Sequence, residues 1–385
     1  LIGIAFKLND PDNLLKSGKE GVTVALLEKN HPGLLQDTHH NPLNVGFPNG
    51  TLKGTIEIEL DSIIGGESNI GNGWKMLMEC LAAGRGISLP ATANASSKVA
   101  TWGVYNYAKH RKQFKIPLIK IEGVQNKLCN MIYHTWIIQS SVTLTNDILD
   151  QGNSPAVVSA IMKQQCTERA RLVLNEAMDI HAGASICLGY SNFLEKFYRS
   201  APIGITVEGS NTLTRSLIIF GQGLNKSHPY IFPILNSILN DDLGSFKQNF
   251  KNIVKHSLNL YGNSFSFSKD LNQQIINFAC LTNFVAIKGG SLKKEQMLSG
   301  DMADIFSNLY LALSVQYHHD NHQSSDKLTQ YVINLLMKEN QEKINKIVNN
   351  LGPERFLLQH LKKKPKVHKY TDERDIFHEI MNNSN

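Results

Sequence analysis

The chain has 385 residues, of which 42% are hydrophobic and 19% charged, so it is long enough to bury a sizeable core in two or three packed layers. The net charge of +6 comes from basic residues scattered among acids, which argues against nucleic acid as a partner. No run of about 18 consecutive apolar residues occurs, so the composition predicts no membrane span.

The cysteines and histidines do not form the patterns of a disulfide framework or a metal site. Five cysteines lie far apart, without a CxxC pair, which favours free thiols in a reducing compartment. The histidine pairs His39-His40 and His318-His319 lack the spacing of zinc ligands. We therefore expect no metal.

The first 66 residues have the pattern of strands. The N-terminal LIGIAFKLND has no signal-peptide features and resembles a strand cut from its partners, which suggests a fragment. GVTVALLE follows, and TIEIEL (55–60) alternates at period two, as a half-buried antiparallel strand does. A few strands alone leave exposed edges, so this segment is expected to pack on other parts of the protein.

From about residue 69 the pattern becomes helical. A long helical stretch reaches the basic cluster near residue 111, with a kink or break expected at Pro90. Further helices are predicted at about 121–150, 153–182, 241–261, 268–294, 296–317 and 325–348. The sequence thus predicts a mainly α protein with a small β segment, in which long helices form a bundle.

The segment ITVEGSNTLTR (205–215) is the most informative one for chemistry. Glu208 stands between apolar residues, Gly209 permits close approach of a ligand, and Ser210 can cap the following helix. An apolar setting raises the pKa of a carboxylate and makes it a better base, whereas a helix N-terminus acts the other way. From the residues alone, a capping acid on an ordinary helix remains the competing interpretation.

Several motifs in order resemble the acyl-CoA dehydrogenase family. VEGSNTLTR is similar to the family's EGTxxxxR segment, His110-Arg111-Lys112-Gln113-Phe114 to its RxxF flavin site, and MDIHAGA (178–184) to its QxxGG stretch. The segments MECLAAGRGISLPA and GGSLKKEQMLSGDMADIFSNLYLALSV resemble the long proteobacterial fatty acyl-CoA dehydrogenases of β-oxidation. The resemblance covers about residues 1–320.

The resemblance implies a partial acyl-CoA dehydrogenase fold in three parts. These are a remnant of the middle β domain (1–66), a C-terminal helical bundle with the base (67–226) and an extra helical region (227–385). The family's N-terminal helical domain, and the strand and loop that wall the flavin ring, are expected to be missing before Leu1.

The resemblance also assigns roles to individual residues. Glu208 is the base that takes the α-proton of an acyl-CoA thioester, and FAD is the cofactor that accepts the β-hydride. Arg85 and Gly209 are substrate-contacting positions. The implied flavin-contacting positions are Arg111, Ser210, Asn211 and Thr212, together with Asp179, Ala182 and Gly183 from a neighbouring subunit.

Simpler interpretations remain open for three of these residues. Arg111 could be part of a basic helix end, Arg85 a surface ion pair and Gly183 a helix stop. Two departures from the family also bear on the flavin. Glu122 and Asp179 each stand at a position where the family usually has Gln. An acid near the flavin phosphates is unfavourable unless it is paired with a positive charge.

The resemblance implies FAD-dependent conversion of a fatty acyl-CoA to a trans-2-enoyl-CoA in fatty-acid β-oxidation. Its implied partners are an electron-transfer flavoprotein or another acceptor, and either a homo-oligomer or a separate N-terminal half. The alternatives are a truncated inactive remnant and a non-catalytic helical partner of an intact subunit.

A cytoplasmic location is expected, with peripheral attachment to the inner membrane as a variant. The basic run at Lys362, Lys363, Lys364 and Lys366 is read as a solvated tail, or else as attracted to anionic lipid or CoA phosphates.

Overall fold

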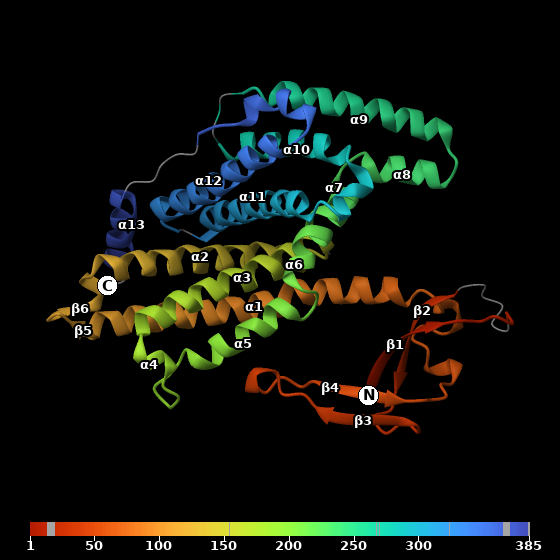
Figure 1. Cartoon of the computed structure of the whole chain (residues 1–385), viewed down its shortest axis with the longest axis horizontal. Helices are drawn as coiled ribbons and strands as arrows, with labels where there is room; N and C mark the ends of the chain where they lie inside the picture. The colour runs from red at the N-terminus through yellow and green to blue at the C-terminus, as the bar shows by residue number, and fades with distance from the viewer. Residues whose placement is uncertain are drawn as a thin grey trace. The chain divides into compact units, whose positions relative to one another are not determined.

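Helices dominate the computed structural model, which describes residues 1–13, 20–153, 155–266, 268, 270–322, 324–364 and 370–383 (Figure 1). The chain forms two compact units, 1–84 and 85–385, and the boundary falls inside the first long helix, α1 (Gly73–His110). The mainly α fold with a small β segment is confirmed. The domain boundaries after residues 66 and 226 stay predictions, and Lys366 of the basic run lies outside the described residues.

The first unit contains two short antiparallel sheets. Strand β1 (Ile2–Leu8) pairs with β2 (Gly21–Leu27), and β3 (Leu34–His39) pairs with β4 (Gly50–Gly54). One face of β2 is buried through Thr23, Ala25 and Leu27. The predicted strands at the N-terminus and in GVTVALLE are thus confirmed, and β1 has its partner within the chain.

The predicted strand TIEIEL is wrong. Residues 55–59 carry no strand, although Ile56 and Ile58 are less exposed than their neighbours, as the alternation predicts. Strand β4 ends at Gly54, which pairs with Leu34, and none of the described segments pairs with residues 55–59. The side-chain pattern of a strand is present, but without hydrogen-bonded neighbours it does not make a strand.

The second unit is helical. Its elements are the short hairpin β5 (Lys112–Gln113) and β6 (Ile116–Pro117), α2 (Glu122–Asp150), α3 (Ala156–His181), α4 (Gly183–Ile186), α5 (Glu195–Thr206), α6 (Asn211–Leu213), a π-helix (Thr214–Gln222), α7 (Gly223–Ser227), α8 (Ile231–Leu239), α9 (Leu243–Asn263), α10 (Leu271–Ala286), α11 (Gln296–His322), α12 (Asp326–Asn350) and α13 (Tyr370–Asn383). Helix α2 packs against both α3 and α11, and α11 also packs against α12 and the π-helix. Their shared core is apolar and almost fully buried.

Most of the predicted helices are confirmed, with two corrections. The helix predicted at 268–294 ends at Ala286, and a turn with Gly289 in the left-handed region follows it. Of the kink or break predicted at Pro90, the break is wrong, because helix α1 continues through this residue, and the kink stays a prediction. Proline removes one backbone hydrogen bond, but Pro90 is buried and Ala93 beside it packs in a core cluster with α2 and α3. Tertiary packing thus offsets the local penalty.

A search of the described residues finds no helix long and apolar enough to cross a membrane. All five cysteines are free, as the sequence predicts.

Candidate active site

The loop between α5 and α6 holds Glu208 in an unusual backbone conformation. Glu208 has φ 55° and Gly209 has φ 94°, so two consecutive residues lie in the left-handed region. For a residue with a side chain this costs about 1–2 kcal/mol, and such strain persists only where the surroundings hold it. The Glu208 side chain is exposed, so this chain alone does not supply the apolar setting expected from the sequence.

Lys163 holds this loop from inside the bundle. It lies on α3 and is fully buried, and its Nζ donates to the Gly209 carbonyl at 2.5 Å and to Asn211 Oδ1 at 2.7 Å. Burial, followed by the positive charge of Arg85, lowers the pKa of Lys163 to about 8, against the opposing charges of Glu208 and Glu168. A buried ammonium therefore fixes the backbone beside the candidate base.

Asn211 completes this anchor. Its side-chain nitrogen donates to Thr167 Oγ1 and to Glu168 Oε1, both at 3.0 Å, while its oxygen accepts from Lys163. The two donors and the acceptor of the amide are thus used within the fold. The Asn211 side chain, implied by the resemblance to contact the flavin, is engaged with α3 instead.

Ser210 and Thr212 on either side of Asn211 are exposed, as is Gly209. Ser210 occupies the N-cap position of α6, but its side chain makes no capping hydrogen bond, so the predicted cap is wrong. Helix α6 has only three residues before the chain enters the π-helix, and Thr214 N bonds to the Ser210 carbonyl at 2.9 Å. The loop is therefore ordered by the buried anchor below it rather than by a cap.

Arg85 lies near this anchor, on α1. It is half-buried, and its Nε is buried without a hydrogen-bond partner among the described residues. The positive charge of Arg85 lowers the pKa of Lys163. A buried guanidinium N–H without a partner is costly.

Arg215, the last residue of the VEGSNTLTR motif, connects the π-helix to α11. Its Nε donates to Asp304 Oδ1 at 2.6 Å, and its Nη2 lies 3.4 Å from Asp301 Oδ1. Gly300 leaves room for this guanidinium, because a Cβ there would lie 2.4 Å from Nη1. The motif arginine thus fixes the segment after Glu208 to the extra helical region.

The remaining predicted flavin positions gather at the other end of α3. Arg111 is exposed after the end of α1, and Ala182 and Gly183 are exposed at the end of α3. The rings of Tyr107 and His181 meet edge to face with centroids 4.5 Å apart, which brings these two helix ends together. Ala182 has φ 51°, a conformation that glycine adopts without strain.

Both acidic departures from the family are paired. Asp179 Oδ2 lies 2.8 Å from Lys127 Nζ, which also binds Glu176. Glu122, the first residue of α2, accepts from Arg374 Nε of α13 at 2.7 Å. Among the described residues no ion pair involves Arg111, so its guanidinium is available to an anion.

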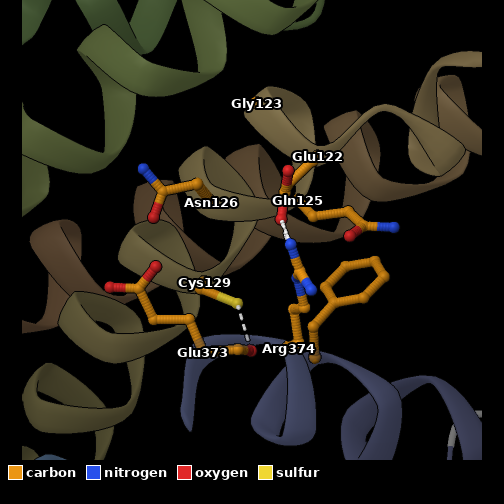
Figure 2. A pocket seen from close by; sticks show the side chains of 8 residues that line it. Glu122, Gly123, Gln125, Asn126, Cys129, Glu373 and Arg374 are labelled. Atoms are coloured by element: carbon orange, nitrogen blue, oxygen red, sulfur yellow. Dashed lines mark hydrogen bonds and ion pairs between the residues drawn. The ribbon is translucent and has the colours of Figure 1, made fainter. Parts of the chain in front are cut away.

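A cavity of about 490 Å³ lies beside the Glu122–Arg374 pair, between α2 and α13 (Figure 2). Cys129 faces it and its Sγ lies 3.7 Å from the Glu373 carbonyl. Burial raises the pKa of this thiol to about 12, so it carries no thiolate at neutral pH and is not a nucleophile. In the described residues no cluster of three potential metal ligands was found.

The predicted residues thus form two groups, which lie beside different parts of helix α3. The first group surrounds Glu208 and Lys163, and the second surrounds Asp179 and Arg111. Residues 163 and 179 lie about 24 Å apart along the axis of α3 at about 1.5 Å per residue. Sequence reasoning missed Lys163, although a lysine that directly follows the apolar run VVSAIM was a visible signal.

Two family models match the chain. The acyl-CoA dehydrogenase C-terminal domain matches residues 71–221, and the bacterial-type C-terminal region of acyl-CoA dehydrogenases matches residues 261–372. An acyl-CoA dehydrogenase of Bacillus subtilis is 26% identical over 219 residues, which are 56% of this chain and 55% of that protein. Protein HemX of Proteus mirabilis is 44% identical over 98 residues, 25% of this chain and 58% of its own length.

The fold also has a solved counterpart. The structure of an acyl-CoA dehydrogenase complexed with FAD from Bacillus anthracis has a TM-score of 0.74 at 20% identity, over 94% of this chain and 66% of that one. The present chain spans about half the length of the curated relatives it matches.

Proposed function

We propose that this chain, which belongs to the acyl-CoA dehydrogenase family, supplies the base for FAD-dependent α,β-dehydrogenation of a fatty acyl-CoA. In this proposal the α C–H bond breaks and its proton passes to Glu208. FAD, when bound, would supply the acceptor for the β-hydrogen and its electron pair, and the product would be a trans-2-enoyl-CoA of fatty-acid β-oxidation. The electrons then pass to an electron-transfer flavoprotein or another acceptor.

The observation that carries the proposal is the anchored left-handed pair Glu208–Gly209. Lys163 and Asn211 hold the backbone of this loop in place, so that the Glu208 carboxylate stays exposed and positioned. Gly209 has no side chain to obstruct a ligand, and the Glu208 N–H is proposed to donate to the thioester oxygen as charge develops there. Arg85, half-buried on α1, is proposed as a substrate-contacting residue from the resemblance of its segment to the family.

The second group of residues fits the diphosphate of FAD. Arg111 presents an exposed planar fork without an ion pair among the described residues, which suits a phosphate. The pairing of Glu122 with Arg374, and of Asp179 with Lys127, reduces the repulsion that these acids would exert on it.

Because this group lies about 24 Å from the Glu208 group along α3, we propose that it serves the flavin of a second copy. The complete site would then need a homo-oligomer.

The test uses the purified full-length protein that contains this chain, loaded with FAD and mixed anaerobically with fatty acyl-CoAs of several chain lengths. We expect the flavin absorbance to bleach, and Glu208→Gln to retain the flavin while slowing bleaching at least about 1,000-fold. Glu342→Gln, which changes an exposed residue of α12, is the matched control and should bleach at the wild-type rate.

Other outcomes separate the competing functions. A Glu208→Gln protein that bleaches normally shows that another group is the base. A full-length protein that binds FAD but reacts with no acyl-CoA contradicts the proposed substrate. A protein that binds no flavin, yet associates with an intact homologous subunit, favours the non-catalytic partner.

A further inference from the structure

The helical hairpin formed by α8 and α9 exposes an unusual amount of apolar surface. Figure 1 shows the two helices side by side, joined by a short turn. Eight large apolar side chains on the hairpin are between 43% and 82% exposed: Phe232, Leu235, Ile238, Leu239, Leu243, Phe250, Val254 and Leu258. Isolated exposed leucines need no explanation, but a contiguous set marks an interaction surface.

The hairpin contributes little to the core of the second unit. No residue of α9, a helix that lies wholly in the described part of the chain, is buried, and in α8 only Ser237 is. Leu260 and Tyr261, near the end of α9, pack against the edge of the main core cluster. The apolar face of the hairpin is therefore not covered by the described part of this unit.

A row of lysines borders the exposed face. Phe250, Val254 and Leu258 follow one another at intervals of four residues, so they form one line along α9. Lys247, Lys251 and Lys255 have the same spacing and form a second line, in which Lys251 and Lys255 directly follow Phe250 and Val254, about 100° around the helix. All three lysines are exposed, and none forms an ion pair among the described residues.

The acids of the hairpin lie at its turn. Asp241 is exposed there, and Asp242 caps α9 by accepting from Ser245 N at 2.9 Å. The capping geometry directs the Asp242 carboxylate to the helix N-terminus, which already compensates part of its charge. Along the length of α9 the charged residues are all lysines.

We propose that the α8–α9 hairpin is a membrane-surface anchor that lies in the headgroup region of an anionic bilayer. Exposed leucine and phenylalanine side chains would enter the boundary of the acyl chains, while the adjacent lysine row would contact anionic headgroups. The charge favours a lipid surface over a second copy of this chain, because a symmetric pairing of the hairpin would bring two lysine rows together. The proposal does not depend on the chemistry of Glu208.

The test is cosedimentation of the purified chain with vesicles of phosphatidylcholine alone or mixed with phosphatidylglycerol. We expect binding to the anionic vesicles that weakens as salt is added. Lys247→Gln/Lys251→Gln/Lys255→Gln should weaken this binding on the order of 100-fold, at about 1 kcal/mol per lysine. Leu239→Ser/Leu243→Ser/Leu258→Ser should weaken it at least about tenfold.

Two matched controls locate the surface. Ile186→Ser/Leu188→Ser removes exposed apolar groups outside the hairpin, and Lys362→Gln/Lys363→Gln/Lys364→Gln removes charge from the basic run. Both should bind vesicles like the wild type, and circular dichroism should show every variant folded.

Three results would overturn the proposal. The first is no binding to phosphatidylglycerol vesicles, and the second is a loss caused by the basic-run substitutions instead of the hairpin ones. The third is a concentration-dependent dimer, seen by light scattering, that the leucine substitutions dissociate while vesicle binding is unchanged. In that case a second copy covers the face.

Discussion

Helices α3 and α9 distribute polar and apolar residues in opposite ways. Helix α3 buries polar side chains, among them Lys163, Gln164 and Arg169, and each has hydrogen-bond partners. Helix α9 exposes apolar side chains such as Phe250 and Leu258. Polar groups inside a core are tolerated when they are paired, and apolar groups outside it mark a contact. The comparison teaches that buried polar side chains and exposed apolar side chains mark the parts of the molecule for which we propose a function.

The largest expected difference comes from one substitution made in both helices. Leu174 of α3 is 1% exposed and Leu258 of α9 is 67% exposed. Leu174→Ala should lower the free energy of unfolding by about 2–5 kcal/mol, since it leaves a cavity, whereas Leu258→Ala should change it by less than about 0.5 kcal/mol. Urea denaturation measures both. Equal losses in the free energy of unfolding for the two variants would mean that α9 belongs to the core. That result would contradict the difference between the two helices.

A second pair replaces a lysine in each helix. Lys163→Met leaves the Gly209 carbonyl and Asn211 Oδ1 without their donor, so we expect a loss of about 1–3 kcal/mol in unfolding free energy. Lys251→Met on exposed α9 should change it by less than about 0.5 kcal/mol. Hydrogen exchange of the amides around Gly209 should rise in the first variant alone. Unchanged exchange there would argue against Lys163 as the anchor of the loop.

The buried lysine also predicts a pH dependence. In the folded chain the pKa of Lys163 is lowered to about 8 from 10.5, so between these values the unfolded chain binds more protons. This contribution to stability therefore rises as pH increases from about 8 to 10.5 and is lost as pH falls toward 8. The difference in unfolding free energy between the wild type and Lys163→Met should grow across this window. A constant difference would contradict a lowered pKa.

The smallest expected effect lies at the end of α3. Ala182→Gly relieves a positive φ of 51° and should stabilise the fold by about 1 kcal/mol. Ala184→Gly in α4, whose φ is not positive, should destabilise it by a similar or smaller amount. Thermal unfolding of the two variants should therefore shift in opposite directions. A shift of the same sign would mean that Ala182 is not strained.

The sequence predicted those features that depend on local pattern. Apolar periodicity located α2, α3, α9, α11 and α12, and the ordered motif around Glu208 located the loop with the candidate base. The predicted strand TIEIEL and the break at Pro90 were wrong, because pairing partners and tertiary packing decide these features. Lys163 was missed for the same reason, since its partners Gly209 and Asn211 lie more than 40 residues further along the chain.

The charges beneath the candidate base link two protonation equilibria. The negative charge of Glu208 favours the ammonium form of Lys163, whereas Arg85 opposes it. A proton that Glu208 accepts would cancel this favourable charge and lower the pKa of Lys163 further. Proton uptake by the candidate base would therefore weaken the ammonium form of its own anchor, Lys163.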